Sequence, residues 1–474
     1  MQTYITKEHK LKDQKNGPSA MFALLKERNF RLLWFGEGIS LLGDQFYLIA
    51  LPWLVLQLTG DAFAMGMVLA VASVPRAIFI LLGGALTDRF CPRSVMLNSN
   101  LLRMGLVTVL TVFVLTGAIQ LWMLYIFAFI FGLVDAFFYP ASAAIVPQLV
   151  DKERLQAGNA LIHGTAQLSL FAGPVLAGLL IGLLSSESLQ IGFLGGEHLL
   201  HSAVTTESVP GMQGIGLSFA VDALTFFVSA IMLWFMNVPK LLEKSEKSSK
   251  SVLSSMRTGL ASMWNDNTLR ALFFIIAAIN LLFNGPVMVG VPVLADLRFD
   301  GAMAFGLLTS AFGGGSLLGT ILAGTLPRPA PRHLGPLLLI IMSLLGIGLT
   351  LLAFIWSTLL AALVGLVMGT ANGYVLVLFV TWLQVRTPQA MQGRMMSLLL
   401  FASLGIVPIS MALSGALIEV NTQAFFVGAG GLLTIIMLLS ACNPAVRTMG
   451  LKKQLEHSKP LLIMERPSAR KSQR

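Results

Sequence analysis

The stretch GGALTDRFCPRSV, residues 83–95, carries one acid and two arginines directly after a long, almost uncharged run of residues. A second long apolar run follows it. Because about 20 consecutive apolar residues can cross a bilayer as a helix, the two runs predict membrane spans. The short charged stretch between them predicts a tight turn at the membrane surface, with its glycines allowing the two helices to approach closely.

The composition extends this prediction to the whole chain. Of 474 residues, 55% are hydrophobic and 11% charged, and the mean hydropathy is +0.80. A soluble protein carries about a quarter charged residues, so the chain is predicted to be a polytopic membrane protein. Its two cysteines, Cys91 and Cys442, lie far apart, which argues against a disulfide framework or a thiolate metal site.

Apolar windows predict an all-α integral membrane protein with twelve transmembrane helices in two six-helix bundles. The predicted spans are residues 31–57, 63–86, 95–117, 121–146, 157–184, 214–237, 269–295, 303–326, 334–356, 358–384, 394–418 and 423–442. The predicted domains are a cytoplasmic tail 1–30, a first bundle 31–237, a cytoplasmic linker 238–268, a second bundle 269–442 and a basic cytoplasmic tail 443–474.

The distribution of basic residues predicts the orientation. If both termini are cytoplasmic, only Arg298 of the 32 Lys and Arg residues falls in an outside loop, as the positive-inside rule requires. We therefore expect a multi-pass protein of the cell membrane. The net charge of +10 comes from scattered loops and tails rather than one basic stripe, so we expect no nucleic-acid partner. The first twenty residues lack the apolar core of a signal peptide.

A long outside loop, residues 185–213, holds His198 and His201 together with several acids. These residue types could bind a metal ion, but in a glycine- and serine-containing loop we expect them to be solvated. The chain contains neither a phosphate-binding loop of the form G-x-x-x-x-G-K-[ST] nor a G-x-S-x-G nucleophile motif. We therefore predict no metal, no cofactor, no catalytic residues and no enzyme activity.

The spacing within residues 83–95 resembles the signature loop of the major facilitator superfamily, G-x-L-x-D-R-x-G-R-[KR], with Cys91 and Pro92 as departures. The resemblance implies the fold of that superfamily and a gate at this loop. In it, Asp88 would clasp the start of helix 11 when the cavity opens outward. The residues that match the gate loop are Gly84, Asp88, Arg89 and Arg93.

The predicted fifth helix contains GTAQLSLFAGPVLAGLL, which resembles the antiporter motif of the same superfamily. The matching residues are Gly164, Gly173, Pro174 and Gly178. Physically, the proline bends the helix and the small residues permit close contact with a neighbour. A simple packing kink without a role in transport is the alternative interpretation.

Several phrases, such as FYPASAAIVPQLV and QVRTPQAMQGRMMSL, are similar to the macrolide-efflux and enterobactin-exporter branch of the superfamily. The resemblance spans roughly residues 27–440. It implies a monomeric secondary transporter that exports hydrophobic or amphiphilic small molecules, such as drugs, macrolides or siderophores, in exchange for protons. An importer or lipid-related flippase is one alternative, and a receptor that binds without transporting is another.

Charged residues within predicted spans are functional candidates because burying them is costly. Counting along the helices places Glu37, Arg76, Arg103 and Asp135 in one layer near the cytoplasmic face. This layer is either an ion-paired structural network or a gate whose pairs exchange during transport.

Asp44 and Asp222 are predicted in the outer half of the membrane, where neither has a base at its depth. A carboxylate among apolar groups binds a proton near neutral pH and releases it when water enters. Asp44 is therefore the first candidate for proton coupling and Asp222 the second, followed by Glu37 and Asp135. A hydrogen bond to a neighbouring helix is the structural alternative for both Asp44 and Asp222.

The second half has no acid deep in a predicted span. Its polar candidates for a substrate cavity are amides, and nearby aromatic rings could stack on a bulky apolar or cationic solute. The candidates for the cavity are Tyr47, Asn280, Phe283, Asn284, Asn372 and Tyr374.

Overall fold

The computed structural model describes residues 23–87, 90–151, 154–185, 211–237, 267–327, 329–330, 333–386 and 403–447. Regular structure in these ranges is helical, without strands. The first six long helices are α3 (Arg28–Thr59), α4 (Ala62–Thr87), α5 (Pro92–Leu115), α6 (Leu121–Leu149), α7 (Leu155–Ser185) and α8 (Met212–Phe235). The later elements are α10 (Asn267–Ile279), η2 (Asn280–Asn284), η3 (Pro286–Gly290), α11 (Val291–Arg298), α12 (Gly301–Thr325), α13 (Leu334–Leu352), α14 (Thr358–Arg386), α16 (Val407–Val420), α17 (Thr422–Ala441) and α18 (Pro444–Arg447).

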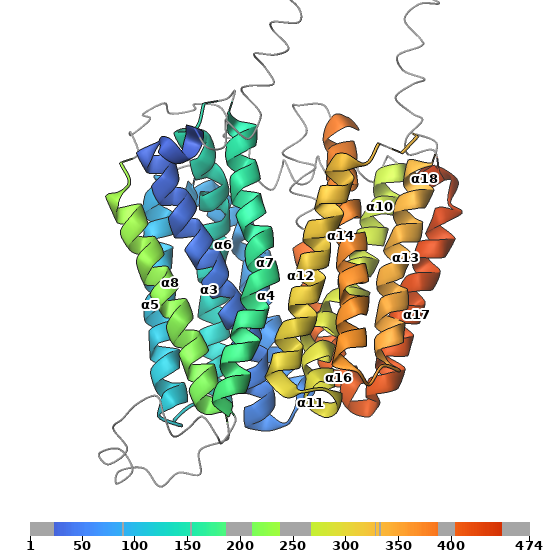
Figure 1. Cartoon of the computed structure of the whole chain (residues 1–474), viewed down its shortest axis with the longest axis horizontal. Coiled ribbons are helices and arrows are strands. Elements are labelled where there is room, and N and C mark those ends of the chain that lie inside the picture. The colour runs from blue at the N-terminus through green and yellow to red at the C-terminus, as the bar shows by residue number, and fades with distance from the viewer. Residues whose placement is uncertain are drawn as a thin grey trace, which may run out of the picture.

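The predicted all-helical membrane fold is confirmed. Eleven helical stretches are long and apolar enough to cross a membrane, and α16 is a shorter apolar helix of 14 residues. Helices α3 to α8 pack on one another, and α10 to α17 form a second group beside them (Figure 1). Most of the predicted tails and linker, within residues 1–22, 238–266 and 448–474, and the first part of the predicted helix 11, residues 394–402, lie outside the described residues.

The connection between α3 and α4 shows how the sequence makes a tight turn. Gly60 ends α3 in the left-handed region with φ 64°, and its N–H donates to the carbonyl oxygen of Leu56 at 2.8 Å. Asp61 then caps α4, because its Oδ1 accepts the backbone N–H groups of Phe63 at 2.6 Å and Ala64 at 3.0 Å. We call the end of the molecule that contains this turn the closed end.

The two groups of helices meet at the closed end, where α7 packs on α12 and α4 packs on α16. Glycine makes the α7–α12 contact possible: a Cβ atom at Gly178 would lie 2.9 Å from the Cα atom of Gly306. The backbone N–H of Val175, which follows Pro174, donates to the Ser310 hydroxyl of α12 at 2.8 Å. A proline disturbs the hydrogen bonds of its own helix, and here the other half supplies an acceptor.

The predicted span 269–295 is present as one continuous apolar stretch, Arg270–Arg298, but it is not α-helical throughout. Two π-helical segments, η2 and η3, separate α10 from α11. Wide turns of this kind are rare and frequently mark functional sites. At η2 the Ser410 hydroxyl of the neighbouring helix α16 bonds to the backbone of Leu281 and Gly285.

Candidate functional site

A buried ion-pair network lies between α4, α5 and α6 in the first half. Asp135 of α6 forms ion pairs through its two carboxylate oxygens with Arg76 of α4 and Arg103 of α5. The Asp135 and Arg103 side chains are 3% and 1% exposed, whereas Arg76 is 31% exposed. The Arg103 guanidinium also lies 4.1 Å from the centroid of the Phe138 ring, a favourable contact for a desolvated cation.

Glu37 bonds to a neutral hydroxyl and not to Arg76 or Arg103, the bases predicted at its depth. Its Oε1 accepts a hydrogen bond of 2.7 Å from the Ser142 hydroxyl of α6. The structure therefore brings three of the four residues of the predicted layer, Arg76, Arg103 and Asp135, into one network, and Glu37 lies in α3 with a neutral partner.

Asp44 and Asp222, the two acids predicted in the outer half, differ in their access to solvent. Asp44 of α3 is half-buried, and its carboxylate has no ion pair or hydrogen bond within the described part of the chain. Asp222 of α8 is fully buried, and neither carboxylate oxygen accepts a hydrogen bond from a described residue. The nearby Thr225 hydroxyl donates instead to the backbone carbonyl oxygen of Asp222, at 2.7 Å.

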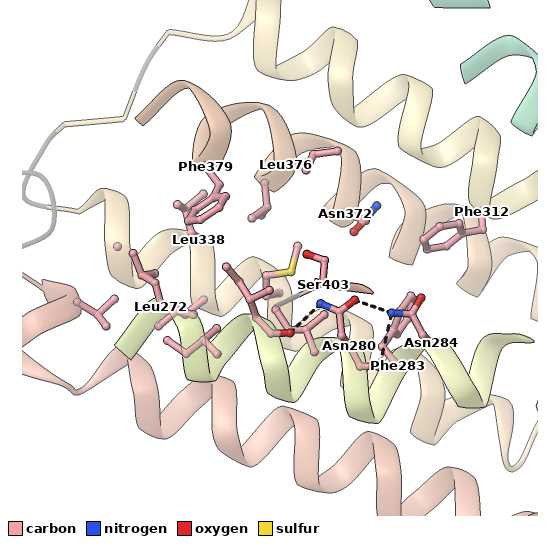
Figure 2. A pocket seen from close by; sticks show the side chains of 18 residues that line it. Leu272, Asn280, Phe283, Asn284, Phe312, Leu338, Asn372, Leu376, Phe379 and Ser403 are labelled. Carbon is pink, nitrogen blue, oxygen red and sulfur yellow. Dashed lines mark hydrogen bonds between the residues drawn. The ribbon is translucent and has the colours of Figure 1, made fainter. Parts of the chain in front are cut away.

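One pocket among the described residues lies within the second half, between α10, η2, α13 and α14 (Figure 2). It has a volume of about 380 Å³, and its lining is mostly apolar. Its polar lining residues are Asn280, Asn284, Asn372 and Ser403. Four of the predicted cavity residues, Asn280, Phe283, Asn284 and Asn372, are therefore brought together.

Two predicted cavity residues lie elsewhere. Tyr47 is 9% exposed and packs inside the first half, stacked on Phe131 with ring centroids 4.3 Å apart. Tyr374 lines a separate crevice between α12, α13 and α14. Both rings pack against apolar side chains. Aromatic character alone therefore did not show whether a side chain lines the pocket.

Sequence reasoning missed Phe312, Phe379 and Ser403, which also line the pocket (Figure 2). A signal existed for Phe379, because it follows Asn372 by seven residues, or about two helical turns, on the same face of α14. Phe312 and Ser403 come from other helices, and no spacing in the sequence connects them to the pocket.

Residues 33–408 match the family model of the Major Facilitator Superfamily. The chain belongs to this superfamily. Membership makes it a multi-pass membrane transporter and not an enzyme.

Among known relatives, the superfamily member from Streptococcus pyogenes called macrolide efflux protein A is 23% identical over 431 residues, covering 89% of this chain and 98% of the relative. The multidrug efflux pump Tap of Mycolicibacterium fortuitum is 23% identical, with 89% and 97% coverage. The enterobactin exporter EntS of Shigella boydii is 25% identical, with 86% and 90% coverage.

Solved structures of the superfamily share the fold. A D-xylose–proton symporter superposes with a TM-score of 0.63 at 15% identity, covering 87% of this chain and 96% of the other. A bacterial homologue of the human lysosomal transporter Spinster, described as inward-facing and unoccupied, gives a TM-score of 0.64 at 14% identity, covering 92% and 99%. At these identities the likeness concerns the fold alone.

The structure describes only part of the loop that resembles the superfamily's signature. Asp88 and Arg89 lie outside the described residues, and Gly84 lies in the last turns of α4. Arg93 is well placed: its Nε and Nη2 donate to the backbone carbonyl oxygens of Leu233 at 2.7 Å and Trp234 at 2.6 Å. The guanidinium thus caps the carboxyl end of α8, where the helix dipole favours a cation.

The helix-5 motif of the superfamily falls in α7. Pro174 and Gly178 lie in the contact with α12. Gly173 faces α3, since a Cβ atom there would lie 2.5 Å from the Cβ atom of Gln45. Gly164 has no atom within 4 Å of such a Cβ position.

No group of three or more metal-ligating side chains occurs among the described residues. His198 and His201 of the long loop lie outside them. Both cysteines, Cys91 and Cys442, are exposed.

Proposed function

We propose that this chain is a proton-coupled exporter that moves hydrophobic or amphiphilic small molecules out of the cell by alternating access. The names of its relatives describe efflux of macrolides, of several drugs and of enterobactin. These relatives are matched over nearly their whole length, which supports export for this chain as well.

The observation that carries the proton-coupling proposal is the position of Asp44. Its carboxylate is half-buried on α3 and has no ion pair in the described part of the chain, whereas Asp135 is held between two arginines. A carboxylate with this freedom can bind a proton in an apolar environment and release it into water. Asp222, fully buried one helix away, is the second candidate.

The proposed orientation places both termini in the cytoplasm, supported by the distribution of basic residues. The closed end, where the two halves meet, then faces outside. This arrangement suits the first step of export, in which cargo enters from inside.

The pocket in the second half supports an apolar or amphiphilic cargo. Its volume of about 380 Å³ falls within the range of small-molecule sites. Phe283, Phe312 and Phe379 contribute aromatic faces, and the amides contribute a few directional hydrogen-bonding groups.

Transport in proteoliposomes tests the proposal, with a panel of uncharged and cationic fluorescent dyes as cargo. The parent protein is expected to concentrate at least one dye against a pH gradient. Asp44→Asn is expected to lose gradient-driven accumulation but to retain counterflow exchange, because exchange needs no net proton movement. The matched control Asp296→Asn, an exposed residue at the closed end that accepts a hydrogen bond from Gln57, should retain both activities.

Three outcomes would contradict the proposal. Accumulation by Asp44→Asn equal to that of the parent across a range of pH would remove this residue from coupling. Accumulation only under the opposite pH gradient would indicate an importer. Saturable binding without any counterflow would indicate a receptor.

A further inference from the structure

The described residues that line the pocket in the second half carry no charged side chain. None of its 18 lining residues is Asp, Glu, Lys, Arg or His. In the described spans of this half, the charged residues lie at helix ends, as Arg270, Asp296, Arg298, Arg386 and Glu419 do. A cation that entered this pocket would lose its hydration without gaining a counter-charge, which is costly in an apolar site.

The amide groups of the pocket are only partly used within the protein. Asn280 donates from Nδ2 to the Ile276 carbonyl oxygen at 2.9 Å, and its Oδ1 accepts from Asn284 Nδ2 at 2.8 Å. Asn284 Oδ1 accepts no hydrogen bond from a described residue and is available as an acceptor toward the pocket. Asn372, on the facing side in Figure 2, makes no hydrogen bond to any described residue and can both donate and accept.

The shape of the Asn280–Asn284 turn depends on Ser410 of α16. The Ser410 hydroxyl donates to the Leu281 carbonyl oxygen at 2.6 Å and accepts the Gly285 N–H at 2.8 Å. In a regular α-helix these two backbone groups would bond to each other. A hydroxyl inserted between them widens the turn, and this turn is the π-helical segment η2.

Two residues at the end of η2 make the insertion possible. Pro286 has no N–H to donate to Leu282, so the helix has one fewer bond to hold it in the α form. Gly285 lets α16 approach, because a Cβ atom there would lie 2.1 Å from the Ser414 hydroxyl oxygen and 2.7 Å from that of Ser410. The wide turn changes which side chains share a face, and so sets how Asn280, Phe283 and Asn284 meet the pocket.

We propose that this pocket selects uncharged amphiphiles with hydrogen-bonding groups. Ser410 is the positioning residue that holds the shape of η2, the turn whose amide side chains bind those groups. The inference rests on the proposed function for its cargo class. Asn284 and Asn372 supply the directional contacts, the phenylalanine rings supply apolar contact area, and the absence of charge excludes cations.

Equilibrium binding to the purified full-length protein in lipid nanodiscs tests this proposal without requiring transport. The two probes are Nile red, which is uncharged and carries a carbonyl acceptor, and ethidium, a permanent cation of similar aromatic size. Signal from empty discs is subtracted. The parent protein is expected to bind Nile red at least about tenfold more tightly than ethidium.

Variants then assign the selectivity. Ser410→Ala and Asn372→Leu are each expected to weaken Nile red binding by about fivefold to tenfold, since each removes one hydrogen-bonding group from the site or its support. Ser410→Thr, which keeps the hydroxyl, is expected to restore most of the affinity. The matched control is Ser343→Ala, because this buried hydroxyl donates within its own helix to Ile340 at 2.6 Å and should leave binding unchanged.

Equal affinity of the parent for the two probes would overturn the selection of uncharged molecules. Unchanged Nile red binding by Ser410→Ala would overturn the positioning role of Ser410. If that variant does not fold, Asn372→Leu tests the selectivity of the pocket, and an unchanged ratio of the Nile red and ethidium affinities would overturn the proposal. Failure of every dye to move in proteoliposomes would reject the proposed transport function, while the binding result would stand by itself.

Discussion

Asp135 is the residue on which the charged centre of the first half depends. Its carboxylate is the anionic partner of both Arg76 and Arg103. Two further guanidinium nitrogens of Arg103, Nε and Nη1, are buried without a hydrogen-bond partner among the described residues. Among the described residues, Asp135 is the acceptor that Arg103 bonds to.

Asp135→Asn is expected to destabilise the protein strongly, by about 3–5 kcal/mol, because it leaves the fully buried Arg103 charge uncompensated. Thermal unfolding of the purified protein measures the effect. Asp44→Asn, which breaks no ion pair, should change the midpoint far less. Equal midpoints for Asp135→Asn and the parent would contradict a structural role for the network.

Asp61 is the second residue whose environment makes a quantitative prediction. The neighbouring Glu419 carboxyl of α16, whose own pKa is raised so that it keeps the shared proton, is the largest cause that holds the pKa of Asp61 below its ordinary value, and the backbone N–H groups of Ala64 and Phe63 add to it. A lowered pKa means that the ionised form stabilises the fold. That stabilisation is complete above the ordinary pKa of about 3.9 and is lost as the pH falls through the lower folded value.

Asp61→Ala should therefore lower the free energy of unfolding by about 1 kcal/mol, the usual cost of losing a helix cap. The difference from the parent should be the same at pH 6 and pH 8 and should shrink only below about pH 4. Asp300→Ala is the control, because Asp300 precedes α12 without a side-chain capping bond. A difference that varies between pH 6 and pH 8 would show that another group titrates at this turn.

At the scale of elements, α16 contacts different neighbours on two of its faces. Ser410 and Ser414 face the π-helical turn beside the pocket, while Gly415 and Glu419 face α4 of the other half. One short helix therefore contacts both the π-helical turn that lines the pocket and the closed end. Any movement of α16 during transport would alter both contacts together.

The α7–α12 contact gives the prediction at this scale. Gly178→Ala is expected to weaken the closed end, because its methyl group would lie 2.7 Å from the Ala302 carbonyl oxygen and 2.9 Å from the Gly306 Cα atom. Distances between spin labels on the two halves should shift toward the arrangement open at this end. Gly164→Ala in the same helix adds a methyl where no atom lies within 4 Å and should leave the distances unchanged, and identical distances for the two variants would contradict the argument.

For the whole molecule, the contacts between halves all lie toward one end in the part of the chain that the structure describes. They involve α7 with α12, α4 with α16, and smaller contacts of α3 with α11 and α12 and of α4 with η3. Gln57 Nε2 donates to Asp296 Oδ1 at 3.0 Å across this junction. Alternating access requires that these contacts break in each cycle.

A reversible cross-link tests that requirement. Gln57→Cys with Asp296→Cys, in a protein whose Cys91 and Cys442 are replaced by serine, is expected to form a disulfide that stops dye transport. A reducing agent should restore transport, and each single cysteine variant should remain active under oxidation. Full transport by the cross-linked protein would contradict opening at this end.

The sequence by itself determined the fold class and the family, because both depend on local chemistry. Long apolar runs specify spanning helices, and basic residues near their ends favour one orientation. The spacing in residues 83–95 can be recognised without knowing which helices it contacts. The amides of the pocket were also predictable, since an amide in an apolar helix needs a polar neighbour or a ligand.

Only the tertiary structure decided which groups meet. The ion pairs of Asp135, the packing of Tyr47 on Phe131 and the capping of α8 by Arg93 each join side chains or backbone groups of different helices. The π-helical turn is the clearest case, because a hydroxyl more than one hundred residues away, on Ser410, replaces a local backbone bond. Helical periodicity describes one helix at a time, so it cannot predict a contact that a second helix supplies.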